Sequence, residues 1–173
     1  MIVDAQGAQD RIRVATALLQ AAADHGVTLA IAESLTGGQV SSSLVEVPGA
    51  SRVLVGTVVA YATRIKAQLL GVDAAHLERT GPVDRDVALQ MADGVRRLLG
   101  ADVGLATTGV AGPGPADGHP AGTVHIAVVA PWGQRHRELH LSGDRSQIRC
   151  ATVMEVCELA IGFLQKDECG PQP

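Results

Sequence analysis

The sequence predicts a single α/β domain of three layers, α/β/α, built around a mixed, mostly parallel sheet. The chain has 173 residues, a length typical of one domain. Apolar runs of strand length alternate along it with segments whose apolar residues recur at helical spacing. Hydrophobic residues make up 46% of the chain, which is enough to fill a packed core. We expect the domain to cover residues 1–165 and a polar, disordered tail to cover residues 166–173.

The order of the expected elements follows from apolar spacing and from the turn residues between apolar segments. Residues 9–23 have helical spacing, and Gly26 after them suits a left-handed helix cap. The run over 27–31 is apolar and partly β-branched, as in a buried strand. Asp84 and Asp144 precede two later helices and are suitable N-caps. Further helices are expected over 39–45, 62–70, 73–79, 85–99 and 145–164, and further strands over 52–61, 102–108, 122–130 and 135–141.

The composition argues against several classes of function. Aromatic residues are only 2% of the chain and the formal net charge is -4, whereas nucleic-acid binders usually offer stacking surfaces and basic patches. No apolar run approaches the length of a membrane span, and the N-terminus lacks the pattern of a signal peptide. The three cysteines, Cys150, Cys157 and Cys169, form no disulfide framework. We therefore expect a cytoplasmic protein without a nucleic-acid or membrane partner.

The turn over residues 32–38 is the first candidate for a functional site. Here Ser34 and Thr36 stand where an expected strand passes into an expected helix, and ligands bind at such strand ends in α/β sheets. The helix start presents unpaired N–H groups and a partial positive charge, and Gly37 and Gly38 allow a ligand to approach closely. The N–H groups near Thr36, Gly37 and Gly38 are thus candidates for an oxyanion hole. The alternative is that Ser34 or Thr36 only caps the helix.

A nucleophilic Ser34 would need an activating base. The turn does not match the G-x-S-x-G elbow of α/β-hydrolases, since Ala32 and Thr36 replace both glycines. Lys66 is a candidate base, because a partly desolvated lysine can lose its proton near neutral pH. The alternative reading of Lys66 is a solvated surface lysine. The other candidate bases are His25, His76, His119, His125, His136 and His140, each of which is more simply explained as a surface or structural residue.

A Gly/Pro-rich loop over residues 109–120 and the start of the last helix are further candidates. The loop reads G-x-x-G-x-G from Gly109 and can cradle an anion or a ribose, although it matches no dinucleotide or Walker motif. Arg145 lies in a first helical turn, where it opposes the helix dipole unless it meets an anion. An ordinary surface arginine is the alternative. No spacing of His, Cys, Asp and Glu suggests a metal site.

Seven short segments stand in an order and spacing that are specific when they occur together. They cover residues 32–38, 47–51, 56–61, 69–72 with Lys66, 108–113, 122–124 and 142–145 with Arg149. In this order they resemble the CinA C-terminal domain family, whose stand-alone members are nicotinamide-nucleotide amidohydrolases. The resemblance extends from about residue 9 to residue 164, nearly the whole chain.

The resemblance implies an enzyme that hydrolyses the carboxamide of nicotinamide mononucleotide to nicotinic acid mononucleotide and ammonia, without cofactor or metal. Ser34 would be the nucleophile, and Tyr61 and Lys66 would assist proton transfer. Glu33 is expected either to bind ribose hydroxyls or to pair with a nearby cation. The resemblance also implies a small-molecule nucleotide as the binding partner and a homo-oligomer such as a dimer. The expected nucleotide-binding residues are Thr108, Gly109, Gly112 and Arg145.

Three segments depart from the pattern of the family. Thr63 and Arg64 stand where the family usually has Asn and an acidic or polar residue, which puts the surroundings of Lys66 in question. The usual Gly-Ala-Val-Ser turn is replaced over residues 81–84, and His119-Pro120 replaces a common Lys-Pro. Two other functions therefore stay open: a non-catalytic nucleotide-binding module, and a regulatory domain linked to competence or recombination. The joint presence of Ser34, Tyr61 and Lys66 favours the enzyme, because a pure interaction domain has no need of all three.

Overall fold

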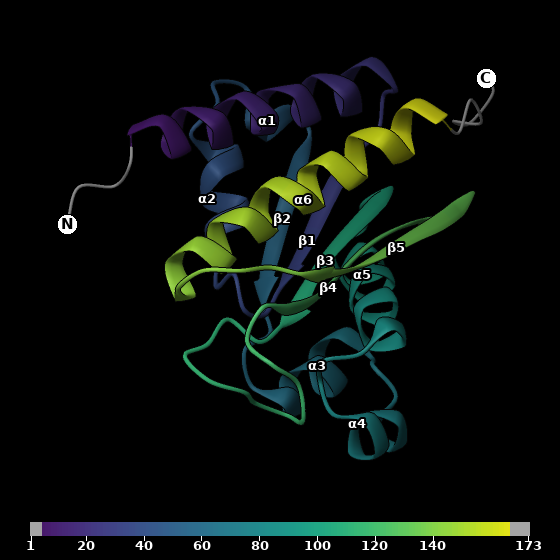
Figure 1. Cartoon of the computed structure of the whole chain (residues 1–173). Helices are drawn as coiled ribbons and strands as arrows, with labels where there is room; N and C mark the ends of the chain where they lie inside the picture. The colour runs from purple at the N-terminus through teal and green to yellow at the C-terminus, as the bar shows by residue number, and fades with distance from the viewer. Residues whose placement is uncertain (1–4, 167–173) are drawn as a thin grey trace.

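The computed structural model describes residues 5–166 and contains a five-stranded sheet between two layers of helices (Figure 1). The strand order across the sheet is β2-β1-β3-β4-β5. The expected three-layer α/β/α class is confirmed. The strands are β1 (Leu29–Glu33), β2 (Leu54–Val59), β3 (Val103–Gly109), β4 (Thr123–Ala130) and β5 (Gly133–His140). The helices are α1 (Ala5–Asp24), α2 (Gln39–Val45), the short 3-10 helix η1 (Ala50–Arg52), α3 (Thr63–Leu70), α4 (Ala74–Thr80), α5 (Arg85–Leu99) and α6 (Arg145–Lys166).

The sheet is mixed, with a parallel half and an antiparallel half. β1 pairs in parallel with β2 on one side and with β3 on the other. β3, β4 and β5 pair antiparallel in sequence, and β4 turns into β5 through the two residues Pro131 and Trp132. Parallel pairings are therefore two of the four rather than the majority. The physical reason is that strands joined without a crossover helix return antiparallel.

The helices cover both faces of the sheet (Figure 1). α1, α2 and α6 enclose one core, in which Leu18, Ile31 and Phe163 are fully buried. α5, with α3 and α4 beside it, encloses the other core, in which small alanines of the strands face Met91. The backbones approach closely on this side, since a Cβ placed on Gly94 would lie 1.9 Å from the carbonyl oxygen of Leu70. The second core thus holds α3 firmly against α5.

The start of β1 differs from the strand expected over residues 27–31. Gly26 adopts a left-handed conformation (φ 64°), and the N–H groups of Gly26 and Val27 donate to the carbonyl oxygens of Ala23 and Ala22. These bonds form a Schellman motif, so Val27 still belongs to the end of α1. The strand consequently runs two residues further, to Glu33, and Ser34 is the first residue beyond it.

The end of the chain also differs from the expectation. α6 continues to Lys166, so the first residue of the expected tail is helical. Residues 167–173, including Cys169, lie outside the described residues. Within residues 5–166 no helix combines the length and the apolar character needed to cross a membrane.

Candidate active site

The carboxyl ends of β1, β2 and β3 meet at one edge of the sheet and form one wall of a pocket of about 210 Å³. Ser34 follows β1 directly, and its N–H donates to the carbonyl oxygen of Thr107 on β3 at 3.0 Å. The green loop that joins β3 to β4 lies next to this edge in Figure 1. The side chains that line the pocket include Ser34, Tyr61, Lys66, Thr108, Asp117 and Arg145.

Lys66 is buried in this pocket with only 1% of its surface exposed. Its Nζ donates to the Oγ of Ser34 at 3.0 Å and to the carbonyl oxygen of Ala60 at 2.7 Å. No carboxylate of a described residue forms an ion pair with it. Burial lowers the pKa of Lys66 from its usual 10.5 to about 8, although the negative charge of Asp117 acts in the opposite direction. At pH 7 the amine beside the hydroxyl of Ser34 is therefore mostly protonated, with a neutral fraction of about one tenth that grows as the pH rises through 8.

The position of Lys66 follows from the short connection between β2 and α3. β2 ends at Val59, and the N–H of Ala60 donates to the carbonyl oxygen of Glu33, so the chain is still paired with β1 when it leaves the sheet. α3 begins at Thr63 and packs on α5 through Leu70. Lys66 lies one turn into α3 and extends back beneath the end of the sheet. Sequence spacing alone did not distinguish this position from a solvated surface.

Glu33 caps helix α2 from the preceding strand. It is fully buried, and its carboxylate accepts hydrogen bonds from the N–H groups of Gly38, Val40 and Ser41 and from the Ser41 hydroxyl, at 2.9 to 3.1 Å. No cationic side chain of residues 5–166 pairs with Glu33, and all four of these hydrogen bonds come from the start of α2. The cap expected from Ser34 or Thr36 is thus supplied by Glu33.

The glycines of the turn are not free to donate to a ligand. The N–H of Gly37 donates to the carbonyl oxygen of Ser34 at 3.1 Å, and the N–H of Gly38 is held by Glu33. Both glycines have left-handed backbones, with φ of 58° and 94°, which explains their presence at these positions. Thr36 is fully buried, and its hydroxyl shares a hydrogen bond of 2.8 Å with the hydroxyl of Thr107.

Two other N–H groups of the turn remain without a hydrogen-bond partner among the described residues, those of Leu35 and Thr36. Arg149 of α6 holds the same two residues by their carbonyl oxygens: its Nε donates to Leu35 at 3.0 Å and its terminal nitrogen to Thr36 at 2.7 Å. Because a trans peptide directs its N–H opposite to its C=O, this fork fixes the direction of the Thr36 N–H. The sequence pattern includes Arg149 but gives it no role, and the structure places its guanidinium on the backbone of the turn that follows Ser34.

Arg145 and Tyr61 lie together at the rim of the pocket. The guanidinium of Arg145 donates to the Tyr61 hydroxyl at 3.1 Å and to the carbonyl oxygen of Gly112 at 2.7 Å. Tyr61 is 62% exposed and makes no hydrogen bond with Ser34 or Lys66. The guanidinium links the loop between β3 and β4 to the end of β2, and it presents a positive charge at the pocket entrance.

The remaining nucleotide-binding candidates have structural partners as well. The hydroxyl of Thr108 donates to the carbonyl oxygen of Pro82 at 2.7 Å, although the residue also lines the pocket. A Cβ on Gly109 would lie 2.6 Å from the carbonyl oxygen of Thr123, so only glycine fits there. Gly112 offers its carbonyl oxygen to Arg145. Thr108 and Gly109 thus line the pocket, whereas Gly112 lies outside its lining and acts on it only through Arg145.

The residues that depart from the family pattern lie in different places. Thr63 lines the pocket, whereas Arg64 is exposed and donates to Gln68 one turn along α3. His119 lies outside the lining of this pocket, as do the other five histidines. Lys66 is therefore the only candidate base, among those considered in the sequence, that the structure brings to Ser34.

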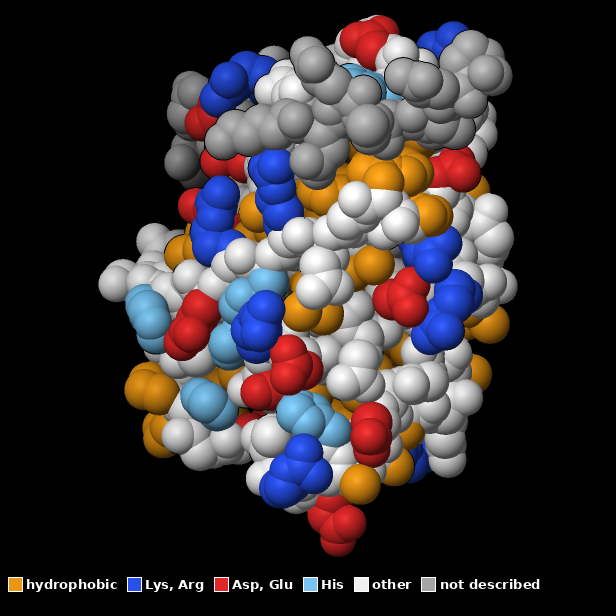
Figure 2. All heavy atoms as spheres, turned by 90° about the vertical axis from the view of Figure 1, so that its right-hand side faces the viewer, with side chains coloured by type: hydrophobic (Ala, Val, Ile, Leu, Met, Phe, Trp, Pro, Cys, Tyr) orange, Lys and Arg blue, Asp and Glu red, His pale blue; other side chains and the backbone are white. Residues whose placement is uncertain are grey.

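The histidines of β4 and β5 lie near the start of α5, since the charge of Asp84 acts on both His125 and His136. Figure 2 shows histidine side chains scattered among acidic and basic ones on one face of the molecule. His125 of β4 and His136 of β5 stack with ring centroids 5.2 Å apart, and their Nδ1 and Nε2 atoms are 2.9 Å apart. Burial lowers the pKa of both imidazoles. The pair lies outside the pocket of Ser34 and forms a cross-strand contact between β4 and β5.

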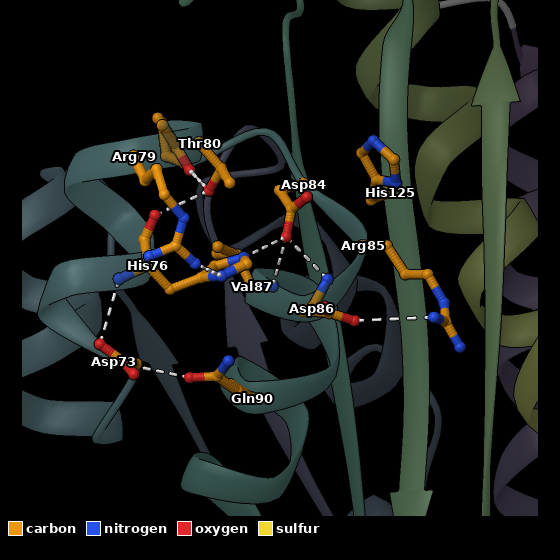
Figure 3. A network of polar contacts seen from close by, with 12 residues as sticks. Asp73, His76, Arg79, Thr80, Asp84, Arg85, Asp86, Val87, Gln90 and His125 are labelled. Carbon is orange, nitrogen blue, oxygen red and sulfur yellow. Dashed lines mark hydrogen bonds and ion pairs between the residues drawn. The ribbon is translucent and has the colours of Figure 1, made fainter.

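A network between α4 and α5 contains the one described group of side chains close enough to hold a metal ion (Figure 3). The potential ligand atoms of His76, Asp84 and Asp86 lie within 4.8 Å of one another. However, Asp84 Oδ1 already contacts His76 Nε2 at 2.8 Å and accepts from the N–H groups of Asp86 and Val87. Although burial opposes it, these hydrogen bonds lower the pKa of Asp84 below its usual range. The network caps α5, as expected of Asp84, and ties α4 to it.

Comparison with known proteins identifies the family. The sequence profile of the CinA C-terminal domain matches residues 11–164. A competence-damage inducible protein of Desulforamulus reducens is 46% identical over 158 residues, which are 91% of this chain and 38% of that protein. A CinA-like protein of Frankia casuarinae is 48% identical over 135 residues, 78% of this chain and 31% of that protein. The chain thus spans about a third of the length of such curated relatives.

Solved structures agree with this family in fold and in sequence. The competence/damage inducible protein CihA of Agrobacterium tumefaciens superposes with a TM-score of 0.86 at 35% identity, over 91% of this chain and 96% of that one. The competence damage-inducible protein A (ComA) of Klebsiella pneumoniae superposes with a TM-score of 0.87 at 26% identity, over 91% and 99% of the two chains. The chain therefore belongs to the CinA C-terminal domain family.

Proposed function

We propose that this protein hydrolyses the carboxamide of nicotinamide mononucleotide, releasing nicotinic acid mononucleotide and ammonia. One observation carries the proposal: a buried lysine amine, which has no acidic partner within residues 5–166, contacts the hydroxyl of a serine in a pocket. Such a lysine is suited to act as a general base, because burial favours the neutral amine that can accept a proton. The substrate is taken from the resemblance to the family, because the names of the relatives refer to competence and damage rather than to a reaction.

In the proposed acylation step, the Oγ of Ser34 attacks the carboxamide carbon while the neutral amine of Lys66 accepts the Oγ proton. The resulting tetrahedral oxyanion collapses as the Lys66 ammonium returns this proton to the departing nitrogen, which leaves as ammonia. A water molecule then attacks the acyl-Ser34 ester and gives its proton to Lys66. Lys66 passes that proton to the Ser34 oxygen as the acid is released, so that the serine and the amine return to their initial states.

The oxyanion is assigned to the N–H groups of Leu35 and Thr36. These groups have no partner among the described residues, whereas those of Gly37 and Gly38 are already used. One such donor typically contributes about 3 kcal/mol to transition-state stabilisation. Of the three donors expected at this turn, we keep Thr36, and we assign Leu35 in place of Gly37 and Gly38.

Arg145 is assigned to the phosphate of the nucleotide. Its guanidinium stands at the pocket rim, and only two of its donors are known to be used, by Gly112 and Tyr61. Arginine is well suited to a phosphate because it offers paired donors in a fixed plane. Tyr61 contacts Arg145 rather than the Lys66–Ser34 pair, so we assign it to orienting Arg145 and the bound nucleotide.

The test is ammonia release from nicotinamide mononucleotide by the purified protein, with Ser34→Ala and the control Ser42→Ala measured alongside. Ser42 is an exposed serine of α2 outside the pocket, so its variant should match the wild type. Ser34→Ala should lose turnover while keeping its fold and nucleotide affinity. Retained turnover in Ser34→Ala would show direct attack by water. An inactive wild type that still binds the nucleotide would favour a regulatory nucleotide-binding domain instead.

A further inference from the structure

The loop between β3 and β4 contains a tight turn that brings an exposed acidic residue, Asp117, to the lining of the pocket. Ala116 and His119 exchange backbone hydrogen bonds of 3.0 and 2.9 Å, so Asp117 and Gly118 are the two central residues of a hairpin turn. Both have left-handed backbones, with φ of 50° and 81°. Asp-Gly is a favoured pair for this type of turn. The turn therefore fixes the backbone of Asp117 at the pocket wall.

The carboxylate of Asp117 is uncommitted. It makes no hydrogen bond or ion pair with any described residue, yet it lines the same pocket as Ser34 and Lys66. Burial lowers the pKa of Lys66, and the negative charge of Asp117 across the pocket raises it and so offsets part of this lowering. Because Asp117 is exposed and lines the pocket, its carboxylate is available to a ligand bound there.

The loop holds Asp117 apart from the positive charge of Arg145. At one end of the loop Arg145 donates to the carbonyl oxygen of Gly112. At the other end Asp117 lies against the turn that begins α5, since a Cβ on Gly81 would be 3.9 Å from the Asp117 Cβ. No ion pair joins Asp117 to Arg145, both of which are described residues. The pocket consequently presents a cation and an anion at two separate places on its wall.

We propose that Asp117 is a specificity-determining residue that favours a substrate whose ring carries a permanent positive charge. The inference rests on the proposed function. An N-ribosylated nicotinamide is a pyridinium cation, and the same molecule carries a negative phosphate. A zwitterion of this kind complements a pocket with Arg145 at one place and Asp117 at another. The reduced nucleotide has a dihydropyridine ring without charge and gains nothing from Asp117.

Two other roles of Asp117 make different predictions. If the carboxylate acted only through Lys66, its removal would change the rate and the pH profile but not the preference between the two ring states. If it served only the turn, Asp117→Asn would have little effect, because asparagine also tolerates the left-handed conformation. The ratio of the affinities for the nucleotide with a charged ring and the nucleotide with a neutral ring therefore distinguishes the three roles of Asp117.

The experiment measures dissociation constants of nicotinamide mononucleotide and of its reduced form by calorimetry, in Ser34→Ala protein to prevent turnover. Asp117→Asn is introduced into this background, with Glu78→Gln, an exposed carboxylate outside the pocket, as the control for net charge. We expect Asp117→Asn to weaken binding of the pyridinium nucleotide about tenfold and of the reduced form less than twofold. Glu78→Gln should change neither.

An unchanged ratio of the two affinities in Asp117→Asn would overturn this inference and leave the amidohydrolase proposal in place. A ratio that changes equally in Glu78→Gln would also overturn it, because the effect would then belong to the overall charge. Failure of the Ser34→Ala protein to bind either nucleotide, while wild-type protein also releases no ammonia, would overturn the proposed function and this inference with it.

Discussion

The Nζ of Lys66 lies 3.0 Å from the Oγ of Ser34, and its other hydrogen-bond acceptor is also uncharged, the carbonyl oxygen of Ala60. A lysine that is 1% exposed and has no carboxylate partner is unfavourable in its charged form. The fold tolerates this position although an apolar side chain would be more stable there. Such a conflict between stability and local chemistry is typical of catalytic sites.

The first prediction is that Lys66→Met stabilises the protein at neutral pH while abolishing turnover. The pKa of Lys66 falls from 10.5 in the unfolded chain to about 8 in the fold, so the unfolded state binds more protons between these values. The full difference between the two pKa values corresponds to about 3 kcal/mol in the free energy of unfolding. Lys66→Met also loses the hydrogen bonds to Ser34 and Ala60, which makes the gain in stability smaller. We expect the free energy of unfolding to rise by about 1–3 kcal/mol at pH 7.

The gain in stability of Lys66→Met over the wild type should become smaller as the pH rises. It should be fully present below pH 8, decline as the pH rises, and vanish near pH 10.5, where Lys66 is neutral in both states. Urea unfolding of the wild type and Lys66→Met at pH 7 and pH 9.5 measures it. Arg64→Met, on the exposed face of the same helix, is the control and should show no such pH dependence. An equal difference at both pH values would argue against a charged buried Lys66.

The second prediction concerns the pH dependence of the reaction. Since the neutral amine of Lys66 is the proposed base, kcat/KM should rise with pH and level off above an apparent pKa near 8. Asp117 raises the pKa of Lys66, so Asp117→Asn should move this rise to lower pH. The measurement is the rate of ammonia release from pH 6 to pH 10 in both proteins. A rate that falls through this range in the wild type would exclude Lys66 as the base.

Sequence reasoning predicted the elements better than the contacts of their side chains. The helix over residues 85–99 has a regular apolar stripe and an Asp84 cap, and it is found with those bounds. Ser34, Tyr61, Lys66 and Arg145 share one pocket because strand ends and helix starts meet at the same sheet edge. The start of β1 was misplaced because Val27 is held by backbone bonds to α1 that apolar spacing does not reveal.

The roles of individual residues in the turn over residues 32–38 depend on hydrogen bonds that the spacing of residue types in the sequence does not reveal. Glu33 reaches past Ser34 to cap a helix several residues later, which removes it from the pocket and uses the Gly38 N–H. Asp117 was passed over, although the pair Asp117-Gly118 is itself a turn signal. Its importance comes from the pocket that the turn faces, and that depends on the packing of the whole loop.

The third prediction is that Glu33→Gln destabilises the fold. The carboxylate of Glu33 accepts four hydrogen bonds at the start of α2. In Glu33→Gln one carboxylate oxygen is replaced by an NH₂ group, which cannot accept a hydrogen bond from the N–H groups that it faces. Loss of a buried charged acceptor at a helix cap should lower the free energy of unfolding by about 2–3 kcal/mol. Urea unfolding at pH 7 measures this, with Glu46→Gln, an exposed residue at the end of α2, as the control. A variant as stable as the control would contradict the assigned cap.

The fourth prediction is that Arg149→Lys lowers kcat about ten- to a hundredfold with little change in KM. A lysine cannot reproduce the fork by which Arg149 binds the carbonyl oxygens of Leu35 and Thr36. The peptide of Thr36 would then be free to rotate, and an oxyanion donor would lose its fixed direction, which affects the transition state more than the bound substrate.

The matched control is Arg145→Lys at the start of the same helix. Arg145 contacts Tyr61 and Gly112 rather than the oxyanion turn, so its variant should mainly raise KM for the nucleotide. Steady-state kinetics of both variants separate the two roles of these arginines, provided that circular dichroism shows both to be folded. A rise in KM without loss of kcat in Arg149→Lys would assign Arg149 to substrate binding, and the oxyanion donors would then have to be sought outside the turn.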